Sequence, residues 1–381
     1  MLKLPNPFKE IPFHRLGYRN PSPIHSLPAL SQYINNARDP AAPKIRLSVK
    51  RDDQAGRLVG YGNKYRKFEY IVPDILAKNA TTIVTEGGLQ SNHTVQVAGM
   101  ARKLGLKCVV LLHRGIGGWR AARDKNTFAS TGNVQLNKLL DAEVRFTDER
   151  DTGDETGPLI PVLDALRDRG ETPYWISSGA SLHPLGGLGY ARCAFEIEAH
   201  DRTRPARKTP EHIFVACGSG STLAGLIAGF KLIEKLNSKQ AFYRRRNIVG
   251  ILVSRKSRSS QEERILRLAK NTGKLIGLQE DDITPQDVHL EDAFVGDAYG
   301  ILDRGTAETV SLAARTESLL IDPVYTGKVM RGMLSWASSF QPNGANAKAE
   351  DYHALLIHTG GQNALNAYAD VWPTDLQQPL A

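Results

Sequence analysis

The sequence predicts an α/β protein with largely parallel β-sheets. Short runs rich in Val and Ile alternate with helical segments from about residue 44 to residue 252. Strands in such an alternation are joined by right-handed crossovers and pair in parallel. The loops after several of these runs are rich in Gly and Ser, as strand-to-helix turns require. The 381 residues suffice for two domains, or for one large domain with an insertion.

Seven runs have the composition of strands. The run 44–50 opens the series after a proline-rich beginning, and 81–85 (Thr-Thr-Ile-Val-Thr) ends just before Gly87. The run 107–112 (Lys-Cys-Val-Val-Leu-Leu) is almost wholly apolar, as in a strand that is buried on both faces. The remaining predicted strands are 142–146, 173–176, 212–216 and 248–252.

Helical spacing appears between these strands. After Lys64, apolar residues recur at intervals of three and four, which indicates an amphipathic helix. These residues are Phe68, Ile71, Val72, Ile75 and Leu76. The other predicted helices are 91–104, 133–140, 159–169 and 221–236.

Four polar loops stand out, and three of them directly follow strands in this series. Ligands of parallel sheets bind at the carboxyl ends of the strands, so these loops are expected to share one site. They are 87–93, 177–189, 217–222 and 359–363, and all are rich in Gly, Ser, Thr, Asn or His.

Charge and cysteine content exclude several functions. The net charge is +9, but its densest stretches, 202–208 and 244–246, lie between predicted elements without interleaved aromatic residues. We therefore interpret them as solvated loop charge and expect no nucleic-acid partner. Cys108, Cys193 and Cys217 are far apart and odd in number, which argues against disulfides and a structural zinc site, and we expect no metal.

Targeting signals are not evident. No run of about 18 apolar residues is present, so no membrane span is expected. Prolines and an acidic residue interrupt residues 1–10, where a signal or transit peptide would need an unbroken stretch. The expected location is the cytoplasm.

The loop between the strand 212–216 and the following helix has the composition of an anion cup. Its residues are Cys217, Gly218, Ser219, Gly220, Ser221 and Thr222. Glycines let backbone N–H groups approach a phosphate, hydroxyls add donors, and a helix N-terminus adds partial positive charge. No Gly-Lys-Ser/Thr ends the loop, so it is not a nucleotide P-loop. Helix capping explains the same residues equally well.

Lys64 and the segment Ser91-Asn92-His93 suggest a site for an aldehyde cofactor. Lys64 lies between a Gly-Asn turn and an amphipathic helix, which would hold its amine in place. Pyridoxal phosphate is carried as a Schiff base on such a lysine. A solvated lysine and a simple N-cap at Ser91 are the alternatives, and His93 by itself fits a packing role better than that of a base.

Two tyrosines flanked by turn residues are further candidates. Tyr299 lies in Gly-Asp-Ala-Tyr-Gly and Tyr325 in Asp-Pro-Val-Tyr-Thr-Gly-Lys. Either ring could stack on a pyridine, and either hydroxyl could move a proton if nearby positive charge lowers its pKa. A surface turn is the alternative for both.

Together these motifs resemble the fold-type II pyridoxal-phosphate enzymes, specifically the 1-aminocyclopropane-1-carboxylate deaminase and D-cysteine desulfhydrase family. The similarity runs from about Ile45 to about Tyr368, with the motifs in the same order. They are 62–69 (Gly-Asn-Lys-Tyr-Arg-Lys-Phe-Glu), 87–93, 132–135, 183–189, 217–222, 322–328 and 358–361.

The resemblance implies roles for individual residues. Lys64 looks like the Schiff-base lysine, Asn92 like the partner of the cofactor's phenolic oxygen, and Ser91 like the carboxylate-binding residue of the substrate site. The loop 217–222, with Lys67, would hold the phosphate, and Thr326 would face the pyridine nitrogen. Tyr299 and Tyr325 match active-site tyrosines. The implied substrate contacts are Ser91, Asn92, His93, Tyr325 and Thr359.

The resemblance also implies the architecture. It is that of the tryptophan synthase β-like enzymes, with two parallel-sheet, three-layer αβα domains. Residues 1–66 and 179–381 would form the large cofactor-binding domain, and 67–178 a smaller domain that closes over the cofactor. A homodimer is expected.

Thr326 and Thr359 favour the desulfhydrase branch. The deaminases have a glutamate at the first position, which keeps the pyridine nitrogen protonated for ring opening, and an apolar residue at the second. A threonine suffices for β-elimination, which gives pyruvate and ammonia from a β-substituted amino acid. Residues 177–189 and 131–135 look closer to the deaminases, and Val95 stands where the family usually has arginine.

Three alternatives therefore stay open. The chain could be a 1-aminocyclopropane-1-carboxylate deaminase or a specialised β-replacement enzyme, since the loop 113–120 is unfamiliar and the N-terminus and 335–352 are longer than in typical members. It could also be an inactive homologue that binds a phosphate ligand, although such a protein would be expected to lack one of the key residues.

Overall fold

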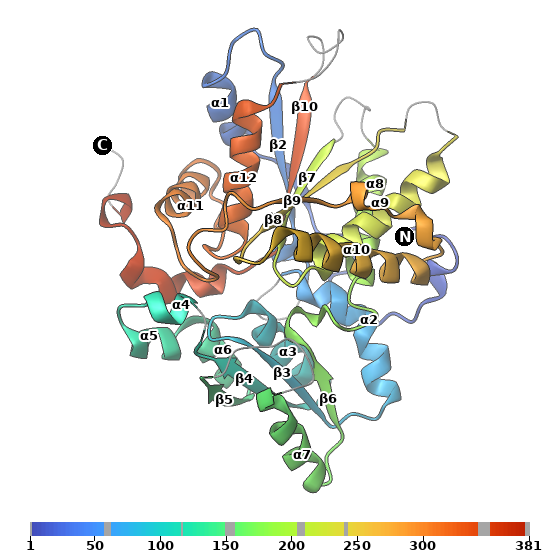
Figure 1. The fold of residues 1–381 in the computed structure, drawn as a ribbon, viewed down its shortest axis with the longest axis vertical. Helices are drawn as coiled ribbons and strands as arrows, with labels where there is room; N and C mark the ends of the chain where they lie inside the picture. Colours follow the sequence, from blue (N-terminus) through green and yellow to red (C-terminus); the bar gives the residue numbers. More distant parts are fainter. Residues whose placement is uncertain are drawn as a thin grey trace.

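Two β-sheets organise the chain (Figure 1). The computed structural model describes residues 2–56, 62–115, 117–148, 157–203, 210–239, 243–341 and 351–377. The larger sheet has the order β1 (Ile24–Ser26), β2 (Ile45–Arg51), β10 (Tyr352–His358), β7 (His212–Cys217), β8 (Asn247–Leu252) and β9 (His289–Glu291). All its pairs are parallel except β1–β2, which is an antiparallel edge.

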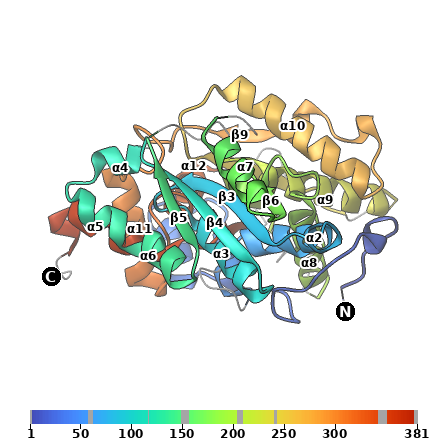
Figure 2. The same ribbon diagram turned by 90° about the horizontal axis from the view of Figure 1, so that it is seen from below.

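The smaller sheet is parallel throughout. Its order is β5 (Glu143–Thr147), β4 (Lys107–His113), β3 (Thr82–Gly88) and β6 (Pro173–Ile176). Figure 2 looks onto this sheet, with α7 (Ile160–Asp168) on one side and α3 (Asn92–Lys103) and α6 (Gly132–Leu139) on the other. Alternate residues of β4 face the two sides, because Val110 and Leu112 pack in the core with α3, whereas Val109 and Leu111 pack with α7.

Helices cover both faces of the larger sheet (Figure 1). One face carries α1 (Pro28–Asn36), α11 (Arg304–Glu317) and α12 (Thr326–Ser339); the other carries α8 (Leu188–Asp201) and α9 (Ser221–Asn237), with α10 (Arg258–Leu275) outside α9. Strand β7 serves both cores, since Ile213 and Val215 face α8 and α9 while Phe214 and Ala216 face α12. This is the three-layer α/β fold that the sequence predicts.

Three further helices belong to the part of the chain around the smaller sheet. They are α2 (Lys64–Ala77), α4 (Gly117–Ala121) and α5 (Lys125–Ser130). Short 3-10 helices are η1 (Phe8–Glu10), η2 (Asp52–Gln54), η3 (Gly157–Leu159), η4 (Ser178–Ala180), η6 (Glu280–Asp282), η7 (Pro285–Asp287), η8 (Gln362–Val371) and η9 (Thr374–Gln377). The division into residues 1–66 with 179–381 and 67–178 remains a proposal, supported by the separation of the two sheets.

A buried ion network ties α2 to the larger sheet. The Arg66 guanidinium lies 2.8 Å from the Asp52 carboxylate and 2.9 Å from that of Glu196, and Lys50 lies 3.1 Å from Glu196. Burial acts to raise the pKa of Asp52, but the neighbouring Arg66 holds it at about 2. The network fixes the start of α2 against η2 and α8.

The structure corrects several predicted boundaries. Gly87 and Gly88 end strand β3 instead of opening a loop, so the connection to α3 is shorter than expected. The predicted loop 177–189 contains η4 and the first residues of α8. The basic stretch 244–246 is not simply solvated: Arg244 pairs with Glu211, Arg245 with Asp287 and Arg246 with Asp201.

Some sequence-based predictions fall outside the described residues. These include Tyr61, residues 204–208 of the first basic stretch, Ile116 in the loop 113–120, and 342–350 within the extra segment. In the part of the chain that is described, no helix has the length and apolar character needed to cross a membrane. Within the same residues, no three His, Cys, Asp or Glu side chains come together as metal ligands.

Candidate active site

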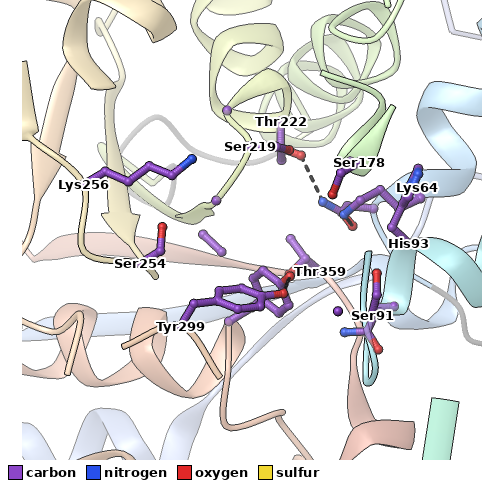
Figure 3. A pocket seen from close by; sticks show the side chains of 18 of the residues that line it. Lys64, Ser91, His93, Ser178, Ser219, Thr222, Ser254, Lys256, Tyr299 and Thr359 are labelled. Carbon is purple, nitrogen blue, oxygen red and sulfur yellow. Dashed lines mark hydrogen bonds between the residues drawn. The ribbon is translucent and has the colours of Figure 1, made fainter. Parts of the chain in front are cut away.

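A cavity of about 690 Å³ opens at the carboxyl ends of strands from both sheets, and Figure 3 shows residues that line it. Segments that are far apart in sequence meet there, including those that follow β3, β7, β8 and β10. Eleven predicted residues line it: Lys64, Ser91, Asn92, His93, Gly218, Ser219, Gly220, Thr222, Tyr299, Tyr325 and Thr359. Lys67, Cys217, Ser221 and Thr326 are not among the lining residues.

Lys64 is held at the start of α2 by contacts with α3 and with the loop after β10. Its backbone N–H and that of Tyr65 both donate to the side-chain oxygen of Gln96, at 3.1 and 3.2 Å. The Asn63 N–H donates to the Thr359 carbonyl at 3.1 Å. A Cβ atom on Gly62 would lie 2.2 Å from that carbonyl oxygen, so only glycine permits this approach.

The Lys64 amine is shifted toward its neutral form. Burial lowers the pKa of Lys64 to about 8, although the Asp322 carboxylate acts in the opposite direction. The Nζ atom donates to the Asn63 side-chain oxygen at 2.8 Å. An appreciable fraction of the amine is therefore uncharged near neutral pH, as a nucleophilic lysine requires.

The loop after β7 forms a cup at the start of α9. Gly220 has a φ of 107°, in the left-handed region that glycine tolerates, and α9 begins at the next residue. The first amides of a helix have no partners within it, so they can receive an anion. The Asn63 amide donates to the Thr222 hydroxyl at 3.0 Å (Figure 3), which links this cup to the lysine.

Lys67 lies behind the cup instead of lining the cavity. Its ammonium donates to the Gly179 carbonyl at 2.8 Å and to the Ser221 hydroxyl at 2.7 Å. The Ser181 hydroxyl bridges Ser219 and Ser221, at 2.6 and 2.9 Å. Burial and the nearby Lys64 hold the pKa of Lys67 well below its usual value. Its influence on the cup therefore passes through serine hydroxyls.

Ser91 and Asn92 stand at the N-terminus of α3. Among the described residues, none bonds to the Ser91 hydroxyl, although Ser91 is only 6% exposed. The Asn92 side-chain oxygen accepts from the Asn133 amide at 2.7 Å, which leaves its amino group as a donor. Asn133 is itself held by Gln90, whose side-chain oxygen accepts from its backbone N–H at 2.9 Å.

His93 is a neutral, packed side chain. Thr85 donates its hydroxyl proton to the Ile176 carbonyl at 2.8 Å, so it accepts from Nε2 of His93 at 2.9 Å. Burial first, and then the charges of Lys64 and Lys67, hold the pKa of His93 well below its usual value. The His93 imidazole is therefore neutral near neutral pH and does not act as an acid there.

The two predicted tyrosines meet on one wall of the cavity. Their hydroxyls share a short hydrogen bond, and the rings of Tyr299 and Tyr325 pack edge to face with centroids 5.9 Å apart. The pKa of Tyr325 is raised well above its usual value by burial and then by Tyr299. The sequence analysis required nearby positive charge to lower this pKa, and the protein alone does not provide that effect. The Tyr325 phenol is therefore neutral.

Thr326 is not among the lining residues, and its hydroxyl is engaged by Asp322. Its hydroxyl donates to the Asp322 carboxylate at 2.6 Å and accepts from the Asp322 N–H at 2.8 Å. The same carboxylate accepts from the N–H groups of Val324 and Tyr325, at 2.9 and 2.8 Å. Asp322 thus shapes the turn that presents Tyr325, and it occupies the hydroxyl that the sequence assigned to a cofactor.

Sequence reasoning missed several residues at this site. Asn133 lies in the motif 132–135 and Ser181 in the predicted loop 177–189, but the sequence around them does not indicate their hydrogen-bond partners. Arg120 also lines the cavity, at the end of the loop 113–120 that the sequence marks as unfamiliar. Lys256 and Arg264 line it too, and both come from a segment with no motif. Their only signal was the basic composition of the chain.

Comparison with known proteins identifies the family. Residues 16–360 match the family model of pyridoxal-phosphate dependent enzymes. The chain belongs to this family. Two curated relatives, named 1-aminocyclopropane-1-carboxylate deaminase, from Burkholderia cenocepacia and Burkholderia multivorans, are each 36% identical over 355 residues. The match covers 92% of this chain and 95% of each relative.

Solved structures agree with the family. A crystal structure described as an ACC deaminase homologue has a TM-score of 0.77 at 29% identity, and the match covers 97% of both chains. An O-ureido-L-serine synthase has a TM-score of 0.59 at 15% identity, covering 98% of this chain and 99% of that one, which supports the fold alone. The predicted fold-type II architecture and family are confirmed.

Enzymes of this family use pyridoxal phosphate, so it is the cofactor of this enzyme, as predicted. The residues at the cavity fit that group. A lysine with a lowered pKa, an anion cup at a helix N-terminus and a donor from Asn92 supply partners for an aldehyde, a phosphate and a phenolic oxygen.

Proposed function

We propose that the enzyme is a lyase that eliminates the β-substituent of a small amino acid and releases pyruvate and ammonia. When bound, the cofactor supplies a sink for the electrons left at Cα. The observation that carries the proposal is the make-up of the cavity wall. No Asp or Glu occurs among the described residues that line it, so no carboxylate is available there to keep a pyridine nitrogen protonated.

Ser91 and the start of α3 are suited to bind the substrate carboxylate. The Ser91 hydroxyl has no described partner and borders the cavity, and the first amides of α3 add donors that have no partner within the helix. Binding at this end of the cavity would bring the α-carbon toward Lys64. The neutral Lys64 amine could then accept the α-proton.

The tyrosine pair is suited to assist the leaving group. Because the pKa of Tyr325 is raised, its phenol keeps its proton near neutral pH and can donate it. The hydrogen bond to Tyr299 fixes the position of this hydroxyl on the cavity wall. An alkoxide that leaves Cβ would thereby be protonated as the bond breaks, whereas a thiolate, a weaker base than the phenolate, would leave without this proton.

Ring-opening deamination is the second candidate, and the relatives favour it. Both curated relatives carry the name 1-aminocyclopropane-1-carboxylate deaminase. The alternative requires a stronger electron sink, because a strained carbon–carbon bond must break without a β-substituent to take the electrons. The cavity wall described above offers no carboxylate for that purpose.

A direct assay separates the two reactions. The cofactor-loaded enzyme is incubated separately with D-cysteine, L-cysteine and 1-aminocyclopropane-1-carboxylate, and sulfide and keto acids are measured, with Lys64→Ala as the inactive control. Sulfide with pyruvate supports β-elimination, and its preferred enantiomer reports the chirality. 2-Oxobutyrate from the cyclopropane acid would instead assign the chain to the deaminases.

A homodimer remains a prediction from the family resemblance, and the cytoplasmic location remains a prediction from the sequence. Light scattering of the purified enzyme tests the assembly. A mass near 84 kDa, about twice the chain mass of 41.9 kDa, is expected; a mass near that of one chain would contradict the dimer.

A further inference from the structure

The cavity carries an excess of positive charge. Lys64, Arg120, Lys256 and Arg264 all line it, and no acidic side chain among the described lining residues balances them. Figure 3 shows the Lys256 side chain reaching into the cavity from the side opposite Lys64. Within the described residues, neither Lys256 nor Arg264 forms an ion pair.

Arg264 is fixed in place without a counter-charge. Its Nε atom donates to the Ser219 carbonyl at 3.1 Å, which seats the guanidinium against the anion cup. Its terminal amino groups bond to no described residue. Burial and then the neighbouring Arg267 lower the pKa of Arg264. A half-buried charge that is stabilised so poorly indicates that an anion completes the site.

Neighbouring arginines of the same segment form ion pairs, which shows that acidic side chains are available nearby. Arg258 lies 2.9 Å from Glu262, and Arg255 lies 3.4 Å from Asp297. Lys256, Arg264 and Arg267 are therefore the cations of this segment that have no acidic partner among the described residues, and the first two line the cavity.

A second hollow continues from the first at these two residues. Its volume is about 450 Å³, and Lys256 and Arg264 line both hollows. The rest of its wall is polar: Ser257, Ser260, Gln261, Glu263 and Arg267. Three cations against one carboxylate, with hydroxyl and amide donors and no apolar side chain, suit a small oxyanion.

We infer that Lys256, Arg264 and Arg267 form a second anion site, which takes a phosphate or carboxylate group other than the phosphate of the cofactor. The cofactor's phosphate has its own cup at the start of α9, whereas this hollow lies beside α10. The anion belongs either to the substrate or to a separate small molecule. The inference rests on the proposed function only in that the main cavity holds the cofactor.

Phosphate binding to the holoenzyme tests the site. Inorganic phosphate is titrated into the cofactor-loaded enzyme by calorimetry, for the wild type and for Lys256→Gln and Arg264→Gln. We expect one site whose affinity falls at least about tenfold in either variant. Arg258→Gln removes a charge from the same segment but leaves the hollow intact, so its affinity should stay within about twofold of the wild type.

Cofactor affinity is measured on the same variants. The inference requires that pyridoxal phosphate content and affinity stay unchanged in Lys256→Gln and Arg264→Gln. If both variants lose the cofactor but still bind pyridoxal, the two cations serve the cofactor's phosphate and the inference is wrong. Absence of phosphate binding to the wild type, or equal binding in all variants, would also overturn it.

Kinetics then identify the source of the anion. If phosphate competes with the amino acid found active in the substrate assay, the substrate carries the anionic group; if it binds without competing, a separate anion occupies the site. Because the calorimetric titration needs no turnover, it stands even if the proposed elimination fails.

Discussion

At the scale of single residues, the site is defined by how its reactive groups are held. Lys64 owes its position to Gln96 and to the Thr359 carbonyl, and its lowered pKa to burial. Asn92 owes its orientation to Asn133. Most residues that line the cavity could be predicted from motifs, but the residues that position them could not, because a hydrogen-bond partner leaves no local pattern in the sequence.

The pKa of Lys64 makes cofactor loading depend on pH. Only the neutral amine attacks an aldehyde, so the loading rate of the apoenzyme should rise with pH, with a midpoint near 8, and level off above it. Stopped-flow absorbance after mixing with pyridoxal phosphate measures this rate. A rate that keeps rising toward about pH 10 would show that Lys64 has an ordinary pKa.

Asn133 is expected to act as a positioning residue. Asn133→Ala removes the donor to the Asn92 oxygen and should weaken the cofactor contact by about 1–3 kcal/mol. The absorption maximum of the bound cofactor should shift, and its dissociation constant should rise. Gln135→Ala changes an exposed side chain of the same helix and should leave both unchanged; equal effects from the two variants would mean that Asn133 only supports folding.

At the scale of elements, strand ends and turns create the cavity. The sequence predicts the strands β2 to β8 well, because most of these parallel strands are buried on both faces and appear as short apolar runs. It gives little sign of α10, α11 and α12, whose apolar positions are mixed with many polar residues. Lys256 lies just before α10 and Arg264 within it, and for this reason the basic end of the cavity was not predicted.

The Gly62 turn is the tightest approach between the lysine segment and the loop after β10. Gly62→Ala places a Cβ 2.2 Å from the backbone carbonyl of Thr359, so one segment must move. We expect a loss of about 1–3 kcal/mol in unfolding free energy, together with incomplete cofactor loading.

Gly105→Ala is the control for this change. Gly105 has a φ of 72°, and no atom lies within 4 Å of the place that a Cβ on this residue would take. Alanine there is strained without a clash, and the position lies in the turn between α3 and β4, away from the cavity. The unfolding free energy of the Gly105→Ala variant should fall, while its cofactor loading stays complete. Full loading of Gly62→Ala would contradict the claim that this turn positions Lys64.

At the scale of the whole molecule, a buried ion network holds the lysine helix against the larger sheet. Asp52→Asn leaves the buried Arg66 charge only partly compensated and should reduce the unfolding free energy by about 3–5 kcal/mol. Chemical denaturation at neutral pH measures this change. Asp351→Asn breaks an exposed pair with Arg46 and should change stability by less than about 1 kcal/mol.

The same carboxylate makes stability depend on acid. The pKa of Asp52 is about 2 in the folded chain and about 3.8 when unfolded, so its contribution is complete above about pH 4 and is lost as the pH falls through 2. The difference in unfolding free energy between wild type and Asp52→Asn should shrink over this range. A difference that stays constant between neutral pH and pH 2 would show that Asp52 is not paired as described.

The central claim is that Lys64 carries the cofactor, and chemical trapping tests it most directly. The holoenzyme is reduced with borohydride, digested and mapped by mass spectrometry. We expect the phosphopyridoxyl group on the peptide that contains Lys64. Its appearance on Lys67, buried behind the anion cup, or on Lys256, across the cavity, would contradict this claim.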